Sequence, residues 1–490
     1  MTRPKYPLPY RYTIFRETTS PELQWLLGIM DQSPFPSIAR LAARLISTIA
    51  PMCDRCSSLV AVLGPDAGCY LVGGAVRDAA LGVEAKDIDI ALRLAPEEVQ
   101  ERLSAAGFRT YATGLRHGTI TVLLADDTPV ELTTYRLPNP ENAPLFSDSV
   151  EVDLSGRDFT INAIAIDVTK RTIIDPFNGL DDLRRRVVRA VQNPHHRLSE
   201  DPLRILRMVR FGPAADRQID EHTQAAARTL VDRITAVSVE RQREELIQIL
   251  CSPHPRAGFY ALRDIEVLPL LLPEVMPSIG CDQNRWHVED VFNHTLSVIE
   301  RTPPHDRILR LAALFHDTGK PATLSIDEEG NRHFYGHEVV SAELCEQALT
   351  RFRCSNDEVR DVTLLVRNHM RSIDCGPPGV RRLFRDLGDQ FERFRAFQDA
   401  DKTPVLSEED HLIRVGRFDA LVAAERKRLE GKPIDKLCVN GHDLMGLGIA
   451  PGPLLGRVLN ELAEFVLDDP DRNERAVLLE RASQLISENK

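Results

Sequence analysis

The sequence predicts an α+β chain, in which an α/β head is followed by an elongated all-α body. Between residues 70 and 175 short β-rich runs alternate with helical ones, whereas from about residue 180 amphipathic helical periodicity dominates. The 490 residues, 43% of them hydrophobic, are enough for about two to four domains with cores of their own. We expect an N-terminal extension with a lead helix (1–55), the head (56–180) and a helical neck (181–270). A domain with a second group of candidate functional residues (271–405) and a helical tail (406–490) follow.

Composition excludes several classes of protein. Lys and Arg number 61 against 73 Asp and Glu, a net charge of −12, so any nucleic-acid contact must come from local basic patches. No stretch approaches 18 apolar residues, and the N-terminus lacks the apolar segment of a signal peptide. Nine scattered cysteines, with one C-x-x-C at Cys53 and Cys56, favour a reducing environment over a metal or redox motif. We therefore expect a cytoplasmic protein without a membrane partner.

The head elements follow from periodicity, while residues 1–35 show no clear pattern. Apolar residues at helical spacing predict a helix over 36–50. Alternation and β-branched residues predict strands over 69–72, 87–92, 119–125, 130–136 and 161–167. We expect a five-stranded mixed sheet with helices on one side.

A glycine turn is followed closely by paired aspartates. The first strand ends in Gly73 and Gly74, and the helix that follows carries Arg77. Two glycines let backbone N–H groups approach a phosphate, which the start of a helix also favours. Asp87 and Asp89 are two residues apart in a strand, so both carboxylates leave the same face and suit Mg²⁺ bound to substrate phosphates. A tight turn with two solvated aspartates is the alternative that either feature alone would favour.

Four segments in order carry a family resemblance. The runs LVGGAVRDAALG…KDIDIAL, RDFTINAIA, EDPLRILRMVRF and SVERQREE resemble motifs of the class II tRNA nucleotidyltransferases (the CCA-adding enzymes) and their poly(A) polymerase relatives. The match covers residues 70–250. It implies addition of CMP and AMP to the 3′ end of tRNA, with tRNA, CTP and ATP as partners and Mg²⁺ in the head.

The resemblance also assigns residues. Asp87 and Asp89 are the expected catalytic metal ligands, and Glu131 is a third candidate whose alternative is a solvent-facing strand residue. Arg157 is implied to contact the triphosphate, and Asp158 and Asn162 the ribose. The alternative is that Asp158 caps a local turn and Asn162 satisfies buried backbone groups. The full set expected to bind nucleotide is Gly73, Gly74, Arg77, Arg157, Asp158, Asn162, Asp201, Arg204, Arg207 and Arg210.

Asp201 and Arg204 are three residues apart, which on one helix places them on one face. Cytosine and adenine both present an exocyclic amine beside a ring-nitrogen acceptor. A carboxylate accepts from the amine and a guanidinium donates to the ring nitrogen, whereas uracil and guanine present the opposite pattern. The pair can therefore select CTP and ATP, as the resemblance implies. Asp201 before Pro202 is equally a good helix cap.

The segment from Arg184 to Arg210 contains eight arginines and only two acidic residues. Surface solvation commonly explains such a run, but in an acidic protein this density suggests contacts with RNA phosphates. We expect Arg184, Arg185 and Arg186 to bind RNA. The glycine- and proline-rich segment 438–456 resembles the tail of bacterial relatives and reads as a turn between helices that holds RNA or only packs.

Residues 294–401 hold a second constellation of histidines and aspartates. The segment AALFHDTGKPAT resembles the HD phosphohydrolase superfamily, whose ligands match His294, His316, Asp317 and Asp401, with His337 and His369 for a second ion. Imidazole with carboxylate suits a transition metal such as Ni²⁺ or Mn²⁺. The domain would hydrolyse cyclic phosphates or phosphomonoesters at RNA ends, or serve as a scaffold.

Two departures from the family keep alternatives open. Gly156 stands where the family has an arginine, and the loop 137–154 lacks its basic stretch and looks short. CC-only or A-only addition, poly(A) synthesis, and an HD phosphohydrolase whose N-terminal domain only grips RNA are the alternatives. The oligomeric state is not readable.

Overall fold

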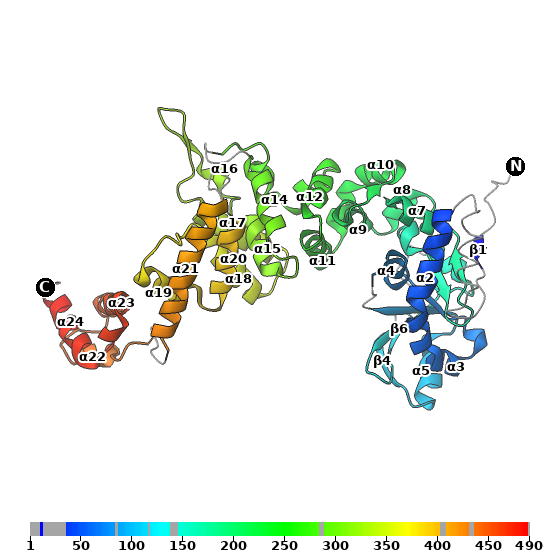
Figure 1. Cartoon of the computed structure of the whole chain (residues 1–490), viewed down its shortest axis with the longest axis horizontal. Coiled ribbons are helices and arrows are strands. Elements are labelled where there is room, and N and C mark those ends of the chain that lie inside the picture. The colour runs from blue at the N-terminus through cyan, green and yellow to red at the C-terminus, as the bar shows by residue number, and fades with distance from the viewer. Residues whose placement is uncertain are drawn as a thin grey trace. The chain divides into compact units, whose positions relative to one another are not determined.

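The computed structural model describes residues 10–12, 36–83, 87–115, 118–137, 146–283, 289–401, 408–430 and 436–488. These residues form two compact units, residues 1–271 and 272–490 (Figure 1). The first contains a mixed sheet and the second is almost entirely helical. The predicted α+β class is confirmed.

The head is built on one sheet of eight strands in the order β1-β8-β7-β2-β3-β6-β5-β4. The strands are β1 (Tyr10–Tyr12), β2 (Tyr70–Val72), β3 (Ile88–Leu92), β4 (Arg109–Gly114), β5 (Thr119–Leu123), β6 (Pro129–Thr134), β7 (Ala165–Asp167) and β8 (Ile173–Asp175). Within this sheet, as far as the structure describes it, β3 and β6 are the one parallel pair and all other neighbours are antiparallel. The expectation of five strands was wrong, because three-residue strands such as β1 and β8 leave almost no periodicity to read.

The head helices are α2 (Pro36–Arg55), α3 (Ser57–Leu63), α4 (Gly74–Leu81), α5 (Pro96–Ala105), α6 (Val150–Ser155) and α7 (Gly179–Arg185). Apolar residues of α2 such as Leu45 and Ile49 are fully buried, as the helical spacing predicted. The strand predicted over 161–167 begins only at Ala165, because Thr160–Asn162 forms a 3₁₀ turn. That turn brings Asn162 back towards Asp158.

The neck consists of short helices with a two-stranded pair, β9 (Val187–Val188) and β10 (Gln218–Ile219). Its helices are α8 (Pro194–Glu200), α9 (Arg204–Phe211), α10 (Glu221–Thr229), α11 (Val239–Leu250), α12 (Pro255–Asp264) and α13 (Leu268–Leu271). Helix α9 packs against α11. The neck therefore sets α9 against a second helix.

The second unit begins with the helices α14 (Val291–Arg301), α15 (Arg307–Phe315), α16 (Lys320–Thr323), α17 (His337–Arg351), α18 (Asn356–Asn368), α19 (Pro377–Leu387) and α20 (Phe391–Ala400). A hairpin of β11 (Ser325–Ile326) and β12 (Arg332–His333) precedes α17. The chain ends in α21 (Glu408–Arg428), α22 (Gly441–Met445), α23 (Pro453–Asp468) and α24 (Arg475–Glu488), and the predicted turn lies between α22 and α23. The last three helices share an apolar cluster that includes Leu444, Leu462 and Leu478.

No described helix has by itself both the length and the apolarity that a membrane span needs. The bent pair Ile38–Arg55 and Ser57–Leu63 meets both criteria only when the two helices are taken together.

Candidate active site and metal centre

The glycine turn lies against two functional side chains. Gly73 has a φ of +70°, and a Cβ there would lie 3.5 Å from an Arg157 nitrogen and 3.6 Å from an Asp89 oxygen. Positive φ is strained for a residue with a Cβ, so glycine is required at this position. Helix α4 starts at the next residue. The predicted strand–glycine–helix turn is confirmed.

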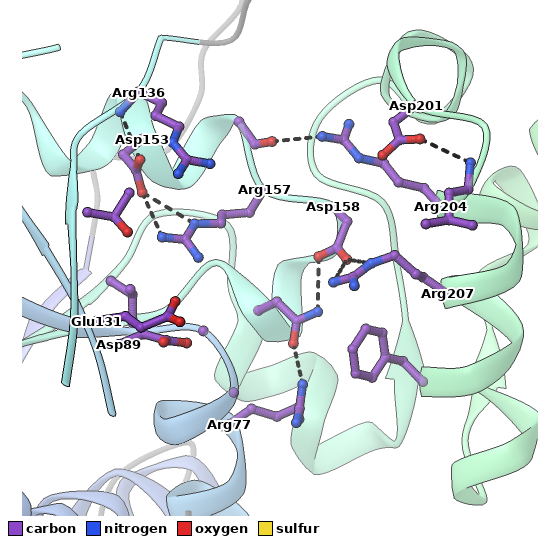
Figure 2. Close-up of a pocket in the computed structure, with 18 of the residues that line it drawn as sticks. Arg77, Asp89, Glu131, Arg136, Asp153, Arg157, Asp158, Asp201, Arg204 and Arg207 are labelled. Carbon is purple, nitrogen blue, oxygen red and sulfur yellow. Dashed lines mark hydrogen bonds and ion pairs between the residues drawn. The ribbon is translucent and has the colours of Figure 1, made fainter. Parts of the chain in front are cut away.

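Three carboxylates lie around the two parallel strands in the middle of the sheet: Asp89 is in β3, Glu131 is in β6, and Asp87 directly precedes β3 instead of lying in the strand as predicted. Asp89 in β3 is the direct parallel partner of Glu131 in β6, and Figure 2 shows the two side by side. Burial raises the pKa of Asp89, and the charges of Glu131 and Asp87 raise it further. Mutual repulsion of this kind is relieved by a bound cation, and hard oxygen donors fit Mg²⁺. The structure thus places Glu131 beside the predicted pair, although the three carboxylates do not all converge within 4.8 Å.

One pocket of about 850 Å³ contains these carboxylates and every residue expected to bind nucleotide. The expected residues in its lining are Gly73, Gly74, Arg77, Arg157, Asp158, Asn162, Asp201, Arg204, Arg207 and Arg210. They come from the turn and helix that follow β2, from the segment between α6 and β7, and from the neck, and Figure 2 labels Arg77, Arg157, Asp158, Asp201, Arg204 and Arg207 among them. Sequence reasoning missed further lining residues: Arg136, Asp153, Arg197, Glu200, Phe211 and Arg241.

The Asp153 side chain binds Arg157 and fixes its orientation. The buried Asp153 carboxylate accepts hydrogen bonds from Arg157, with Nη2 at 3.0 Å, and from the backbone N–H of Arg136 at 2.9 Å. Arg157 therefore points one nitrogen at Asp153 and another towards Gly73. No sequence signal identified Asp153, because its role depends on this convergence.

A chain of polar contacts links the head to the neck. Asp158 is buried and accepts from Asn162 at 3.0 Å and from Arg207 Nε at 2.8 Å, while Asn162 Oδ1 accepts from Arg77 at 2.9 Å. Burial raises the pKa of Asp158, but the Arg207 guanidinium and the hydrogen bonds outweigh it and hold the pKa below its usual range. Asp158 also accepts from the N–H of Phe159 at 2.7 Å, but the N-cap of the 3₁₀ turn Thr160–Asn162 is Phe159, with no side-chain cap hydrogen bond.

Three guanidinium groups surround one aromatic ring in this pocket. Arg77, Arg207 and Arg210 lie 4.8, 5.2 and 4.0 Å from the centre of the Phe211 ring. Glu245 of α11 accepts from Arg210 Nε at 2.6 Å and lies 3.5 Å from Arg207. The face of an aromatic ring attracts cations, so the arrangement holds positive charge in place for an anionic ligand. Glu245 lies in the segment SVERQREE, but its residue type alone gave no reason to select it.

Asp201 and Arg204 do not share a helix, so that prediction was wrong. Helix α8 ends at Glu200 and α9 begins at Arg204, because Pro202 disfavours helical geometry at Asp201, whose φ and ψ are −145° and 99°. The turn still places both side chains in the pocket, as Figure 2 shows. Asp201 Oδ1 accepts from the N–H of Leu203 at 3.2 Å and so closes the turn, but Leu203 is the N-cap of α9, and the expectation that Asp201 caps that helix was therefore wrong.

The three arginines expected to bind RNA lie at the surface. Arg184 and Arg185 pair with Asp181 at 2.6 and 3.6 Å, and Arg186 pairs with Asp216. Exposed pairs of this kind contribute little to stability, so they leave the guanidinium groups open to exchange partners with phosphates. These residues lie outside the pocket lining.

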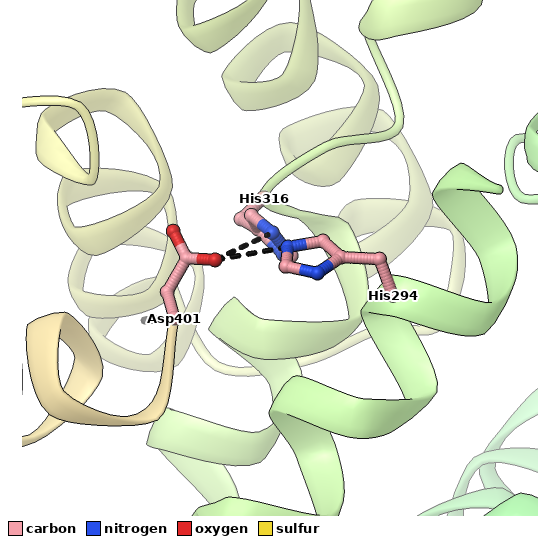
Figure 3. Close-up of side chains that lie close together, drawn as sticks. All are labelled: His294, His316 and Asp401. Carbon is pink, nitrogen blue, oxygen red and sulfur yellow. Dashed lines mark hydrogen bonds and ion pairs between the residues drawn. The ribbon is translucent and has the colours of Figure 1, made fainter. Parts of the chain in front are cut away.

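The second unit brings its predicted ligands into two groups. The first is His294, His316 and Asp401, and the second is Asp317, His337 and His369, each with ligand atoms within 4.8 Å (Figure 3 shows the first group). Asp317 joins the groups, because Oδ2 lies 3.1 Å from His316 Nε2 and Oδ1 lies 3.3 Å from His337 Nε2. A carboxylate in that position can bridge two ions. The His316–Asp317 pair does not lie on helix α15. That helix ends at Phe315, and His316 follows it directly.

Backbone carbonyls orient three of the imidazoles. The Nδ1 atoms of His316, His337 and His369 lie 2.7–2.8 Å from carbonyl oxygens three residues earlier, which directs each Nε2 into the cluster. A second hydrogen bond that fixes the ring in this way is typical of histidine metal ligands. His316 Nε2 is buried and has no hydrogen-bond partner among the described residues. The donor set therefore fits a pair of transition-metal ions.

Cys53 and Cys56 of the C-x-x-C motif are residues of the hydrophobic core. Burial raises the pKa of Cys53 to about 11 and that of Cys56 to about 12, so both thiols stay protonated. Both side chains are completely buried, and neither thiol is part of a disulfide. This agrees with the preference for a structural role.

Four family models match successive segments of the chain between residues 69 and 482. Residues 69–189 match a poly A polymerase head domain and residues 218–279 a probable RNA and SrmB-binding site of polymerase A. Residues 287–406 match an HD domain and residues 417–482 a putative tRNA nucleotidyltransferase domain 2.

Whole-length relatives agree with these domain matches. An A-adding tRNA nucleotidyltransferase of Deinococcus radiodurans is 34% identical, over 81% of this chain and 91% of its own length. A CCA-adding enzyme of Ligilactobacillus salivarius is 29% identical, over 86% and 93%. Among solved structures, the Bacillus stearothermophilus CCA-adding enzyme in complex with CTP has a TM-score of 0.65 at 23% identity, covering 91% and 99%.

The head fold, with paired aspartates beside a glycine turn, defines a nucleotidyltransferase. The four domain matches and the full-length relatives narrow that class. The chain belongs to the class II tRNA nucleotidyltransferase family, in the group that carries an HD domain.

Proposed function

We propose that the head adds CMP and AMP to the 3′ end of tRNA, using CTP and ATP and no nucleic-acid template. The supporting observation is one pocket whose lining brings the three carboxylates at strands β3 and β6 together with Asp201 and Arg204. Relatives named as CCA-adding enzymes agree with it. The reaction would take place in the cytoplasm, which the nine free thiols favour.

The proposed chemistry assigns a role to each side of the pocket. The terminal hydroxyl of the RNA attacks the α-phosphate, a phosphodiester bond forms, and pyrophosphate leaves. Asp87, Asp89 and Glu131 would hold Mg²⁺, which stabilises the attacking and leaving oxygens. Arg157, fixed by Asp153, and the backbone at Gly73 would bind the triphosphate.

The neck side would recognise the nucleoside. Asp158 and Asn162 are hydrogen-bonded to each other and would orient the ribose, with Arg77 behind them. Asp201 would accept from the exocyclic amine and Arg204 would donate to the ring nitrogen. The same two contacts suit cytosine and adenine and oppose uracil and guanine.

An experiment with different tRNA ends distinguishes CCA addition from partial addition and from poly(A) synthesis. One relative is named A-adding and others CCA-adding, and the loop whose sequence departs from the family includes residues 138–145, outside the described residues. Transcripts of tRNA ending at the discriminator base, at C or at CC would be incubated with labelled CTP, ATP or both. We expect CCA to be completed on all three. Action only on CC ends would establish an A-adding enzyme, and growth beyond A would establish a poly(A) polymerase.

A second function is favoured by the two metal groups of the HD domain. We infer phosphohydrolysis at RNA ends, supported by Ni²⁺ or Mn²⁺ bound by His294, His316, Asp401 and the Asp317 group. The test is hydrolysis of a 2′,3′-cyclic nucleotide by the full chain loaded with Ni²⁺, Mn²⁺ or Mg²⁺, with His316→Ala as control. Metal binding without turnover would assign the domain a scaffold role.

Two surfaces would hold the tRNA. Arg184, Arg185 and Arg186 would contact acceptor-stem phosphates, and the tail from Gly441 would hold a more distant part. Charge reversal at the three arginines should weaken binding of tRNA and reduce its dependence on salt.

A further inference from the structure

The carboxylate that would read the base has few fixed contacts. Asp201 lies in the extended turn between α8 and α9, and its side chain is 30% exposed. Oδ1 accepts from the N–H of Leu203 at 3.2 Å. Oδ2 accepts from Arg241 Nη2 at 2.6 Å. Among the described residues these are the two side-chain contacts that hold it, and the one to Arg241 is short and charge-assisted.

Arg204, the other reading residue, is anchored independently of Arg241. Its Nη1 donates to the Arg197 carbonyl at 2.8 Å and to Glu200 at 2.7 Å, and its Nη2 donates to the Gly156 carbonyl at 3.2 Å. Three acceptors on two different segments keep its guanidinium in one place. Of the two side chains that would read the base, Asp201 is therefore the one whose position depends on Arg241.

Arg241 reaches Asp201 from a helix that is itself fixed. It lies in the first turn of α11, and Glu245, one turn further on the same face, binds Arg210 and Arg207. Its side chain is 52% exposed and lines the pocket. Helix α11 thus holds α9 through Glu245 and holds the turn before α9 through Arg241.

From this geometry we propose that Arg241 is a positioning residue for Asp201 and sets how strictly the pocket distinguishes the four bases. The inference rests on the proposed function of the head. With Oδ2 held by Arg241 and Oδ1 by Leu203, the carboxylate keeps its remaining lone pairs towards the pocket and accepts from an exocyclic amine. Without Arg241 the carboxylate rotates away, the amine loses its acceptor, and a base with a carbonyl at that place is no longer opposed.

The test compares Arg241→Gln and Arg241→Lys with the wild-type chain, with Arg243→Gln as matched control. Arg243 is on the same helix and pairs with Glu244 at 2.9 Å. Single-nucleotide addition to tRNA transcripts would be measured with each of the four nucleoside triphosphates. We expect Arg241→Gln to raise KM for CTP and ATP about twofold to fivefold, as for the loss of one half-exposed ion pair, with a smaller change in kcat. Misincorporation of UMP relative to CMP should rise, and Arg241→Lys should restore part of both.

The outcomes separate this inference from the proposed function. If the wild-type chain adds no nucleotide, the proposed function fails. If the wild type is active and Arg241→Gln keeps wild-type KM and selectivity, Arg241 does not position Asp201. A loss of kcat equal for all nucleotides, without rescue by lysine, would also overturn the inference, since it indicates only damage to the fold.

Discussion

The buried carboxylate of Asp158 gives the most quantitative test of how the head is joined to the neck. The substitution Asp158→Asn keeps the shape of the side chain but removes its charge. Two charge-assisted hydrogen bonds to Arg207, at 2.8 Å to Nε and 2.7 Å to Nη2, are weakened. Each such bond contributes about 1.5–3 kcal/mol, but Arg207 is one-third exposed and keeps Glu245, so we expect a loss of about 2 kcal/mol. In a unit of this size that lowers Tm by about 4–8 °C.

The sign of the pH dependence follows from the lowered pKa of Asp158. Burial raises this pKa, but Arg207 and the hydrogen bonds outweigh it, so the ionised form stabilises the fold. That stabilisation is complete above the unfolded pKa of about 4 and is lost only as the pH falls through the lower folded pKa. Calorimetry of the full chain should show the same difference between wild type and variant from about pH 5 to pH 8.

The control for this measurement is Asp181→Asn, which breaks only exposed pairs with Arg184 and Arg185 and should cost less than about 1 kcal/mol. A deficit for Asp158→Asn no larger than the control's would refute the reasoning. So would a deficit that shrinks steadily between about pH 5 and pH 8, because it would mean that Asp158 is protonated in the folded state.

Three further predictions concern other parts of the chain. Because burial raises the pKa of Cys53 to about 11, iodoacetamide should label the exposed Cys438 first and Cys53 only in denaturant; equal rates would contradict this. The full chain should bind two transition-metal ions, and His337→Ala one, as counted by metal analysis after dialysis, whereas unchanged stoichiometry would remove His337 from the second group. Gly179→Ala should destabilise the head markedly in a thermal melt, since the new Cβ would lie 2.2 Å from the carbonyl oxygen of Thr160, and a wild-type Tm would disprove that close approach.

Much of the head could be predicted because its strands are long enough to alternate. The runs that became β3, β5 and β6 were located within a few residues, and the helix α2 was found from its apolar spacing. The edge strand β1 was not found, because three residues paired with β8 carry no periodic signal of their own. Pro202 indicated a possible helix boundary at Asp201, but neither the single helix nor the cap at Asp201 was correct, because α9 begins only at Arg204.

The site was predictable to the extent that its chemistry follows motifs. The paired aspartates and the six candidate metal ligands of the HD domain are recognisable by residue type and spacing. Asp153, Arg241 and Glu245 are ordinary charged residues in sequence, and they matter because the fold brings each beside an opposite charge. Only coordinates reveal such partners when they lie far apart in the chain.

The most direct test of the central claim is a comparison of nucleotide addition by the wild type, Asp89→Ala and His316→Ala on a tRNA transcript ending in CC. The account predicts that the wild type and His316→Ala incorporate AMP in the presence of Mg²⁺, while Asp89→Ala incorporates none despite unchanged binding of tRNA. Incorporation by Asp89→Ala, or its loss only in His316→Ala, would place the chemistry outside the head and contradict the account.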